Sequence, residues 1–157
     1  MNELPDLDEV DRDILRALQA DGRISNVALA ERCRLSPSST LERVRRLERS
    51  GVIEGYVARV APGALGHQVV VFVSVGMREH DQKALTHFER AVAELPEILE
   101  CHHVTGDFDY LLKAIVRDVA ALRSMLVERV SALPSVARVQ TTLVLATSKH
   151  NLDVPIH

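Results

Sequence analysis

The chain has 157 residues, of which 46% are hydrophobic and 26% charged, with a formal net charge of −3 and two cysteines. This composition fits one ordinary domain or two small ones, and it excludes a disordered chain and a disulfide-rich secreted scaffold. The longest apolar run, Val69 to Val73, is far shorter than the roughly 20 residues of a membrane-spanning helix, and the acidic N-terminus is unlike a signal peptide. We therefore expect a cytoplasmic protein that does not enter a membrane.

The charge is distributed unevenly along the chain. Residues 3–13 carry six acids and one base, residues 14–62 carry nine arginines and five acids, and the remainder is mildly acidic. The arginine-rich segment means that the negative total does not exclude a nucleic-acid partner. The change in composition predicts two domains, residues 1–61 and 62–157.

Three helices are predicted in the first domain. Apolar residues at helical spacing over 10–18 indicate the first helix, and Ser25 is the expected N-cap of a short second helix. Ser36 followed by Pro37 is a strong start signal for a third helix, which should end at Gly51. The second and third helices are joined by a turn of three residues, 34–36, and together form a helix-turn-helix pattern.

The third predicted helix has two different faces. One face packs on the preceding helices, whereas the other carries hydroxyl and arginine side chains that suit base edges and phosphates. A solvated amphipathic helix is the alternative for this helix alone, but the preceding helix and turn favour DNA binding. An alternating segment over residues 52–60 predicts a strand, as in a winged helix-turn-helix domain or a linker. The predicted DNA-binding residues are Ser36, Ser38, Ser39, Glu42, Arg43, Arg46 and Arg49.

The second domain is predicted to be an α+β sandwich. A β-branched run over 69–75 indicates a buried strand, and Asp81 and Asp118 are expected to cap two amphipathic helices. The order strand, helix, strand, strand, helix, strand predicts a ferredoxin-like βαββαβ fold with helices on one face of an antiparallel sheet. Because the strands are apolar on both faces, we expect a partner subunit to cover the open face. The other strands are expected over residues 98–104, 110–116 and 136–147.

The sequence contains no catalytic signature. Two short segments of the second domain carry polar groups that could bind a metal ion or a small ligand. On a strand, Cys101 and His103 share one face and His102 points away, so we expect a polar strand edge rather than a metal site. The turn at residues 106–110 offers backbone N–H groups beside two carboxylates, which together can hold a ligand with a carboxylate and an ammonium group. A hairpin turn in which an aspartate caps its own backbone is the alternative.

Two blocks of residues form a specific pattern over nearly the whole chain. They are Asp11-x-x-Ile14-Leu15-x-x-Leu18, Asp21-Gly22-Arg23-Ile24-Ser25, Leu29-Ala30, Leu35-Ser36, and Arg43-Val44-x-x-Leu47-x-x-x-Gly51-Val52-Ile53-x-x-Tyr56 in the first domain, then Gly106-Asp107-Phe108-Asp109-Tyr110-Leu111-Leu112 and Thr141 in the second. This pattern resembles the Lrp/AsnC (feast/famine) transcriptional regulators. Two residues depart from the family's pattern: Arg34 stands where a turn glycine is usual, and Thr40 replaces a usual aliphatic residue.

The resemblance implies a homodimer, often assembled into tetramers or octamers, that binds palindromic double-stranded promoter DNA. It further implies small effectors, usually amino acids, bound between dimers near the turn, and it implies no resident cofactor. Carried over by position, the effector-binding residues are Gly106, Asp107 and Asp109, with Thr105 and Thr141 as secondary candidates.

An enzyme on the same scaffold is the alternative function. Sirohaem decarboxylases resemble this family and bind a large tetrapyrrole with histidines and arginines, and the chain has seven histidines. That alternative predicts a decayed DNA-binding face, whereas the serine and arginine face of the third helix is intact. We therefore expect a regulator that is not an enzyme.

Overall fold

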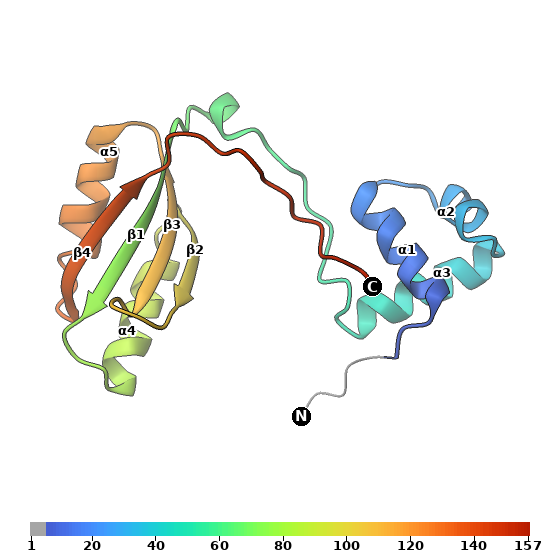
Figure 1. Ribbon diagram of the computed structural model, residues 1–157, viewed down its shortest axis with the longest axis horizontal. Helices are drawn as coiled ribbons and strands as arrows, with labels where there is room; N and C mark the ends of the chain where they lie inside the picture. The colour runs from blue at the N-terminus through green and yellow to red at the C-terminus, as the bar shows by residue number, and fades with distance from the viewer. Residues whose placement is uncertain (1–5) are drawn as a thin grey trace. The chain divides into compact units, whose positions relative to one another are not determined.

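The computed structural model describes residues 6–157, which form two compact units (Figure 1). One unit comprises the chain up to Arg59 together with Lys149–His157, and the other comprises Val60–Ser148. The last nine residues, expected from the sequence in the second domain, thus make their contacts with the N-terminal helices. The Gln19 amide donates to the Val154 carbonyl oxygen at 3.0 Å and accepts from the Val154 N–H at 2.7 Å. No helix in residues 6–157 is long and apolar enough to span a bilayer.

The N-terminal unit consists of the three helices that the sequence predicts. Each helix begins at a side-chain cap, because Asp8, Ser25 and Ser36 accept hydrogen bonds from backbone N–H groups of the following first turn. At Asp8 the capping box is complete. Each helix start is therefore set by residues that are close together in the sequence. The helices are α1 (Glu9–Ala20), α2 (Asn26–Cys33) and α3 (Pro37–Arg49).

The two departures from the family pattern are both accommodated. Arg34 ends α2 in a left-handed conformation, with φ 56° and ψ 41°, which costs an L side chain roughly 1 kcal/mol. Thr40 is fully buried, and its hydroxyl donates to the Ser36 carbonyl oxygen at 3.0 Å, so its polar atom is satisfied. The helix-turn-helix geometry is therefore kept without the usual glycine and aliphatic residue.

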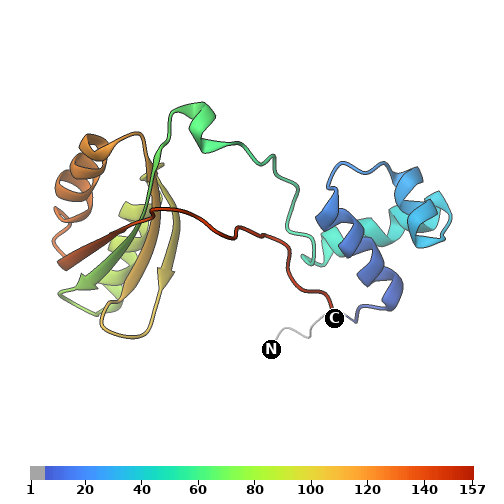
Figure 2. The same ribbon diagram turned by 45° about the horizontal axis from the view of Figure 1, so that its top comes forward.

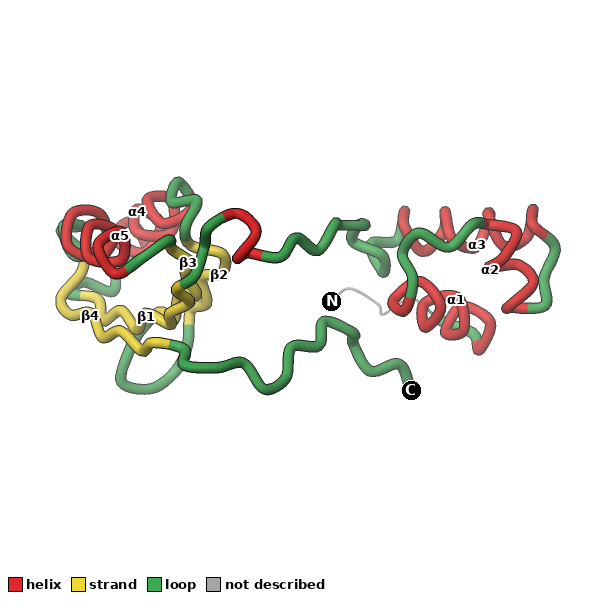
Figure 3. Tube along the Cα trace, turned by 90° about the horizontal axis from the view of Figure 1, so that it is seen from above, coloured by secondary structure: helices red, strands yellow, loops and turns green. Residues whose placement is uncertain are grey.

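The strand predicted over residues 52–60 is wrong. Val52 and Ile53 pack against the helical core, but the rest of the segment is loop and its Val57 is 89% exposed (Figure 3). The alternating pattern is real, but a strand needs a partner for its backbone groups, and the described chain offers this segment none. The N-terminal unit is thus a helix-turn-helix without a wing strand in the described residues.

The second unit confirms the predicted βαββαβ sandwich. Its antiparallel sheet has the strand order β2-β3-β1-β4, and the helices lie on one face (Figures 1 and 2). The last strand ends at Leu143, four residues earlier than expected, although the Val144 N–H still donates to the Val70 carbonyl oxygen at 3.0 Å. The elements are a 3₁₀ turn (Pro62–Leu65), β1 (Val69–Met77), α4 (Gln82–Ala93), β2 (Ile98–His103), β3 (Tyr110–Val116), α5 (Val119–Ser124) with a π-helical continuation (Met125–Val130), and β4 (Val136–Leu143).

The two faces of the sheet differ in how they are covered. Alternate residues of β1 and β3, such as Val73 and Leu112, are fully buried beneath the helices. The opposite face carries Phe72, Ser74 and Leu111, which are only half-buried and lie under no helix. This open face, on which Phe72 and Leu111 lie beside Ser74 and Lys113, is the surface that the sequence predicts to be covered by a partner.

Candidate DNA-binding and effector sites

The outward side of α3 forms a shallow hollow. Side chains three or four residues apart line one face of the helix and enclose about 340 Å³. Ser36 and Ser38 lie at the start of this face, where the Ser36 hydroxyl caps the helix and lies 3.0 Å from that of Ser38. The hollow is lined by Ser39, Glu42, Arg43, Arg46 and Arg49, all of which the sequence predicts as DNA-binding residues.

Two of these arginines are held by aspartates of the first helix. Arg43 donates to Asp8 at 2.7 Å and to Asp11 at 2.9 Å, and Arg46 pairs with the other oxygen of Asp11. The Asp11 side chain is fully buried, whereas the Arg43 and Arg46 side chains are 29% and 52% exposed. The hydrogen bond from Arg43 lowers the pKa of the Asp8 carboxyl below its usual value. The two guanidinium groups are thereby anchored at one edge of the hollow on α3.

Sequence reasoning missed Asp11 as a site residue. The available signal was its position: Asp11 occupies the apolar stripe of α1 three residues before Ile14, where a carboxylate needs a partner. Arg45 was also left out, although it is exposed on α3. Neither Arg45 nor Arg49 forms an ion pair within the described part of the chain, so both are free for an external anion.

The turn between β2 and β3 contains most of the predicted effector residues. Thr105, Gly106 and Asp107 are exposed, and Gly106 has φ 121°, a conformation that favours glycine. Asp109 is different, because its carboxylate accepts from the Met77 N–H at 2.7 Å and lies 2.9 Å from His80 Nε2. The Met77 hydrogen bond lowers the pKa of Asp109. Asp109 therefore ties the turn to the end of β1, and Asp107 is the free carboxylate.

Thr141 lies apart from this turn in a single chain. The strand register places it opposite Val73, four residues along β1 from Met77, whose N–H binds Asp109. Four residues of strand correspond to roughly 13 Å. One chain thus brings together Thr105, Gly106, Asp107 and Asp109, but not Thr141.

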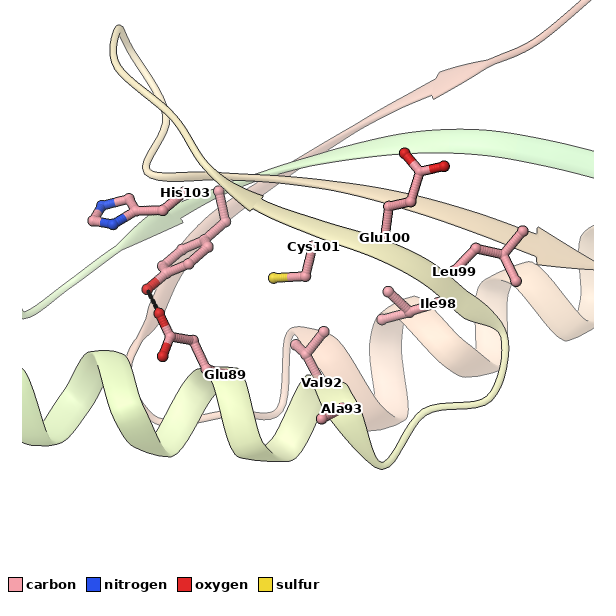
Figure 4. A pocket seen from close by; sticks show the side chains of 9 residues that line it. Glu89, Val92, Ala93, Ile98, Leu99, Glu100, Cys101 and His103 are labelled. Carbon is pink, nitrogen blue, oxygen red and sulfur yellow. Dashed lines mark hydrogen bonds between the residues drawn. The ribbon is translucent and has the colours of Figure 1, made fainter. Parts of the chain in front are cut away.

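A larger hollow of about 460 Å³ lies between α4 and β2 (Figure 4). Cys101 and His103 line it, whereas His102 faces away and lies 3.1 Å from Glu100, as the strand alternation predicts. The Tyr110 hydroxyl donates to Glu89 at 2.8 Å, and burial raises the pKa of this tyrosine. No group of three or more metal-binding side chains gathers within residues 6–157.

Comparison with known protein families identifies both units. The Lrp/AsnC ligand binding domain matches residues 70–154, and a winged helix-turn-helix DNA-binding domain matches residues 7–54. The leucine-responsive regulatory protein of Escherichia coli (strain K12) is 48% identical over 146 residues, which cover 93% of this chain and 89% of that protein. The leucine-responsive regulatory protein of Salmonella typhimurium matches with the same identity and coverage.

Solved structures share the whole architecture. A transcriptional regulator from Neisseria meningitidis in complex with L-Met has a TM-score of 0.92 and 35% identity, over 96% of this chain and 97% of that one. An AsnC family transcriptional regulator from Agrobacterium tumefaciens has a TM-score of 0.89 and 33% identity, over 95% and 97% of the two chains. The likeness thus extends across both units.

Proposed function

The chain belongs to the Lrp/AsnC family of transcription regulators, and on this premise we propose which of its residues contact promoter DNA and which bind an amino-acid effector. One observation carries the proposal. The same chain joins a helix-turn-helix with an arginine-lined outer face to a ligand-binding domain with an exposed, acid-bearing turn. An amino-acid effector is also consistent with the L-Met complex of the Neisseria relative.

The DNA-binding surface is the outer face of α3. Ser38 and Ser39 lie at its N-terminal end, where hydroxyl groups can reach base edges, and Arg49 lies at its C-terminal end, free for a phosphate. Some of the guanidinium N–H groups of Arg43 and Arg46 bind the aspartates of α1, and the remaining N–H groups are available to DNA. In a homodimer, two such helices would read half-sites about 34 Å apart in double-stranded promoter DNA.

The effector site is the turn at residues 105–109. Its Asp107 carboxylate suits an ammonium group, and the backbone N–H groups of residues 105–108 bind no acceptor within the described chain. Thr141 can join this site only from another subunit, which supports effector binding at a junction between dimers. Effector binding there changes DNA affinity if the ligand distinguishes two assemblies.

Asp107→Ala should weaken the binding of amino acids without changing the fold or the basal affinity for DNA. The reason is that Asp107 offers the only carboxylate of the turn that is not already bound to the protein. We expect amino-acid affinity to fall at least about tenfold, since a hydrogen-bonded charge is worth roughly 1.5–3 kcal/mol. Isothermal titration calorimetry against the twenty common L-amino acids measures the loss, and normal titration would contradict the assignment.

Asp109→Asn tests the second carboxylate of the same turn, which is bound to the Met77 N–H. Because the folded protein depresses the pKa of Asp109, its contribution to stability is present above about pH 4 and is lost as the pH falls through the folded value. The variant should therefore be less stable than the wild type at pH 7 and should lose less stability on acidification. Urea unfolding at pH 7 and pH 3 measures this difference. Identical pH profiles would show that Asp109 does not tie the turn to β1.

A further inference from the structure

Arg138 of β4 reaches across the sheet to the effector turn. In the register of β1 and β4 it lies opposite Gly76, and a Cβ at Gly76 would sit 2.8 Å from the Arg138 Cγ and 2.9 Å from its Nε. Such distances are too short for any side chain at position 76, so the glycine is what lets the arginine lie flat over β1. The path of the Arg138 side chain is therefore determined by residues of both β1 and β4.

The guanidinium group of Arg138 contacts the centre of the turn. Its Cζ lies 4.3 Å from the ring centroid of Phe108, and its Nη2 donates to the carbonyl oxygen of Asp107. One hydrogen bond leaves most of the five guanidinium donors available, and the residue is exposed. Arg138 thus brings a positive charge with free donors beside the free Asp107 carboxylate.

The turn otherwise lacks a free cation. His80 lies against Asp109, and Arg78 points its Nη2 at the Val136 carbonyl oxygen at 3.4 Å. In the described chain, Arg138 is the only guanidinium that contacts the turn. An α-amino acid carries one carboxylate and one ammonium group, and the pair Arg138 and Asp107 supplies the opposite charge for each.

We propose that Arg138 binds the carboxylate of the effector while Asp107 binds its ammonium group, so that the site selects zwitterionic α-amino acids. The proposal rests on the effector function proposed above for the turn. A planar guanidinium fork can hold a carboxylate through two parallel hydrogen bonds, which an amide end of a ligand cannot match in charge or geometry. The site should therefore reject an amino-acid amide, although the amide keeps the ammonium group.

The test compares an amino acid with its own carboxamide in wild-type protein and in Arg138→Met. The probes are the tightest binder among the twenty common L-amino acids and the corresponding amide. We expect the wild type to prefer the acid about 30-fold, corresponding to a charge-assisted hydrogen-bonded pair. In Arg138→Met, which keeps the apolar stem over Gly76, the acid should bind about 30-fold more weakly and the preference should disappear.

A purely structural role for Arg138 gives a different result. If the side chain only holds the turn in place, Arg138→Met weakens acid and amide equally and the preference stays, which would overturn the proposal. Arg138→Lys keeps the charge without the fork, so it should retain part of the preference. Wild-type protein that binds none of the twenty amino acids would instead contradict the proposed effector site itself. Unchanged thermal unfolding of the variants confirms that they are folded.

Discussion

Replacing Arg43 and Arg46 together by methionine should lower the stability of the helical unit by about 3 kcal/mol. The double change leaves the buried Asp11 carboxylate with no cation, although its oxygens now pair with both arginines. Removing one side of a buried pair typically costs about 3–5 kcal/mol, and the lower end applies because both arginines are partly open to solvent. Hydrogen exchange of the backbone amides of α1 to α3 measures the loss separately from the sheet.

The control for this prediction is the double variant Arg45→Met and Arg49→Met on the same helix. Both residues are exposed and unpaired in the described chain, so stability should change by less than about 0.5 kcal/mol. Affinity for DNA should instead fall, and the slope of log K against log salt should drop by roughly 2 if each arginine neutralises one phosphate. Equal exchange rates in the two double variants would show that Asp11 does not depend on Arg43 and Arg46.

If subunits associate through the open face of the sheet, as the sequence predicts, Phe72→Asp should yield monomers and reduce the specific DNA affinity by about 1,000-fold. Phe72 lies on the open face of the sheet, between Lys113 of β3 and Thr142 of β4. A carboxylate there would oppose burial against a second copy, whereas in the monomer it lies on a partly exposed face beside Lys113, which also pairs with Glu100. A monomer reaches one half-site only, so its affinity should approach the non-specific level.

Analytical ultracentrifugation and a gel-shift assay measure these two effects in the same samples. Val119→Asp is the matched control, because Val119 is 69% exposed at the first turn of α5, where an acid suits the helix N-terminus. That variant should keep both its assembly and its DNA affinity. A dimeric Phe72→Asp protein would show that the open face is not the surface through which the subunits associate.

Sequence reasoning succeeded where the determining interactions are local. Asp8, Ser25 and Ser36 cap their helices by accepting from N–H groups three residues away. The Ser25 and Ser36 caps were predicted correctly, whereas no single cap was assigned to the first helix. The strand over residues 52–60 failed because pairing depends on a partner segment that the pattern itself does not reveal. The end of β4 was likewise placed too late, at about residue 147 instead of Leu143, because the apolar pattern continues beyond the paired residues.

The candidate sites were predicted as segments but not as networks of contacts. The turn at residues 106–109 was identified from its residue types, yet the difference between a bound Asp109 and a free Asp107 depends on Met77 and His80, about 30 residues earlier. The ion pairs between Asp11 and the α3 arginines likewise join residues 32 and 35 positions apart. Such contacts follow from the packing of helices and strands, which a single sequence does not specify.

The most direct test of the central claim is the affinity of the full chain for a promoter fragment, recovered by chromatin immunoprecipitation, with and without each of the twenty amino acids. A coupling of about 1–3 kcal/mol predicts that at least one amino acid changes the DNA affinity 5- to 150-fold. By linkage, the DNA should change the affinity for that amino acid by the same factor. DNA affinity that stays constant while amino acids saturate the protein would contradict an effector-controlled regulator.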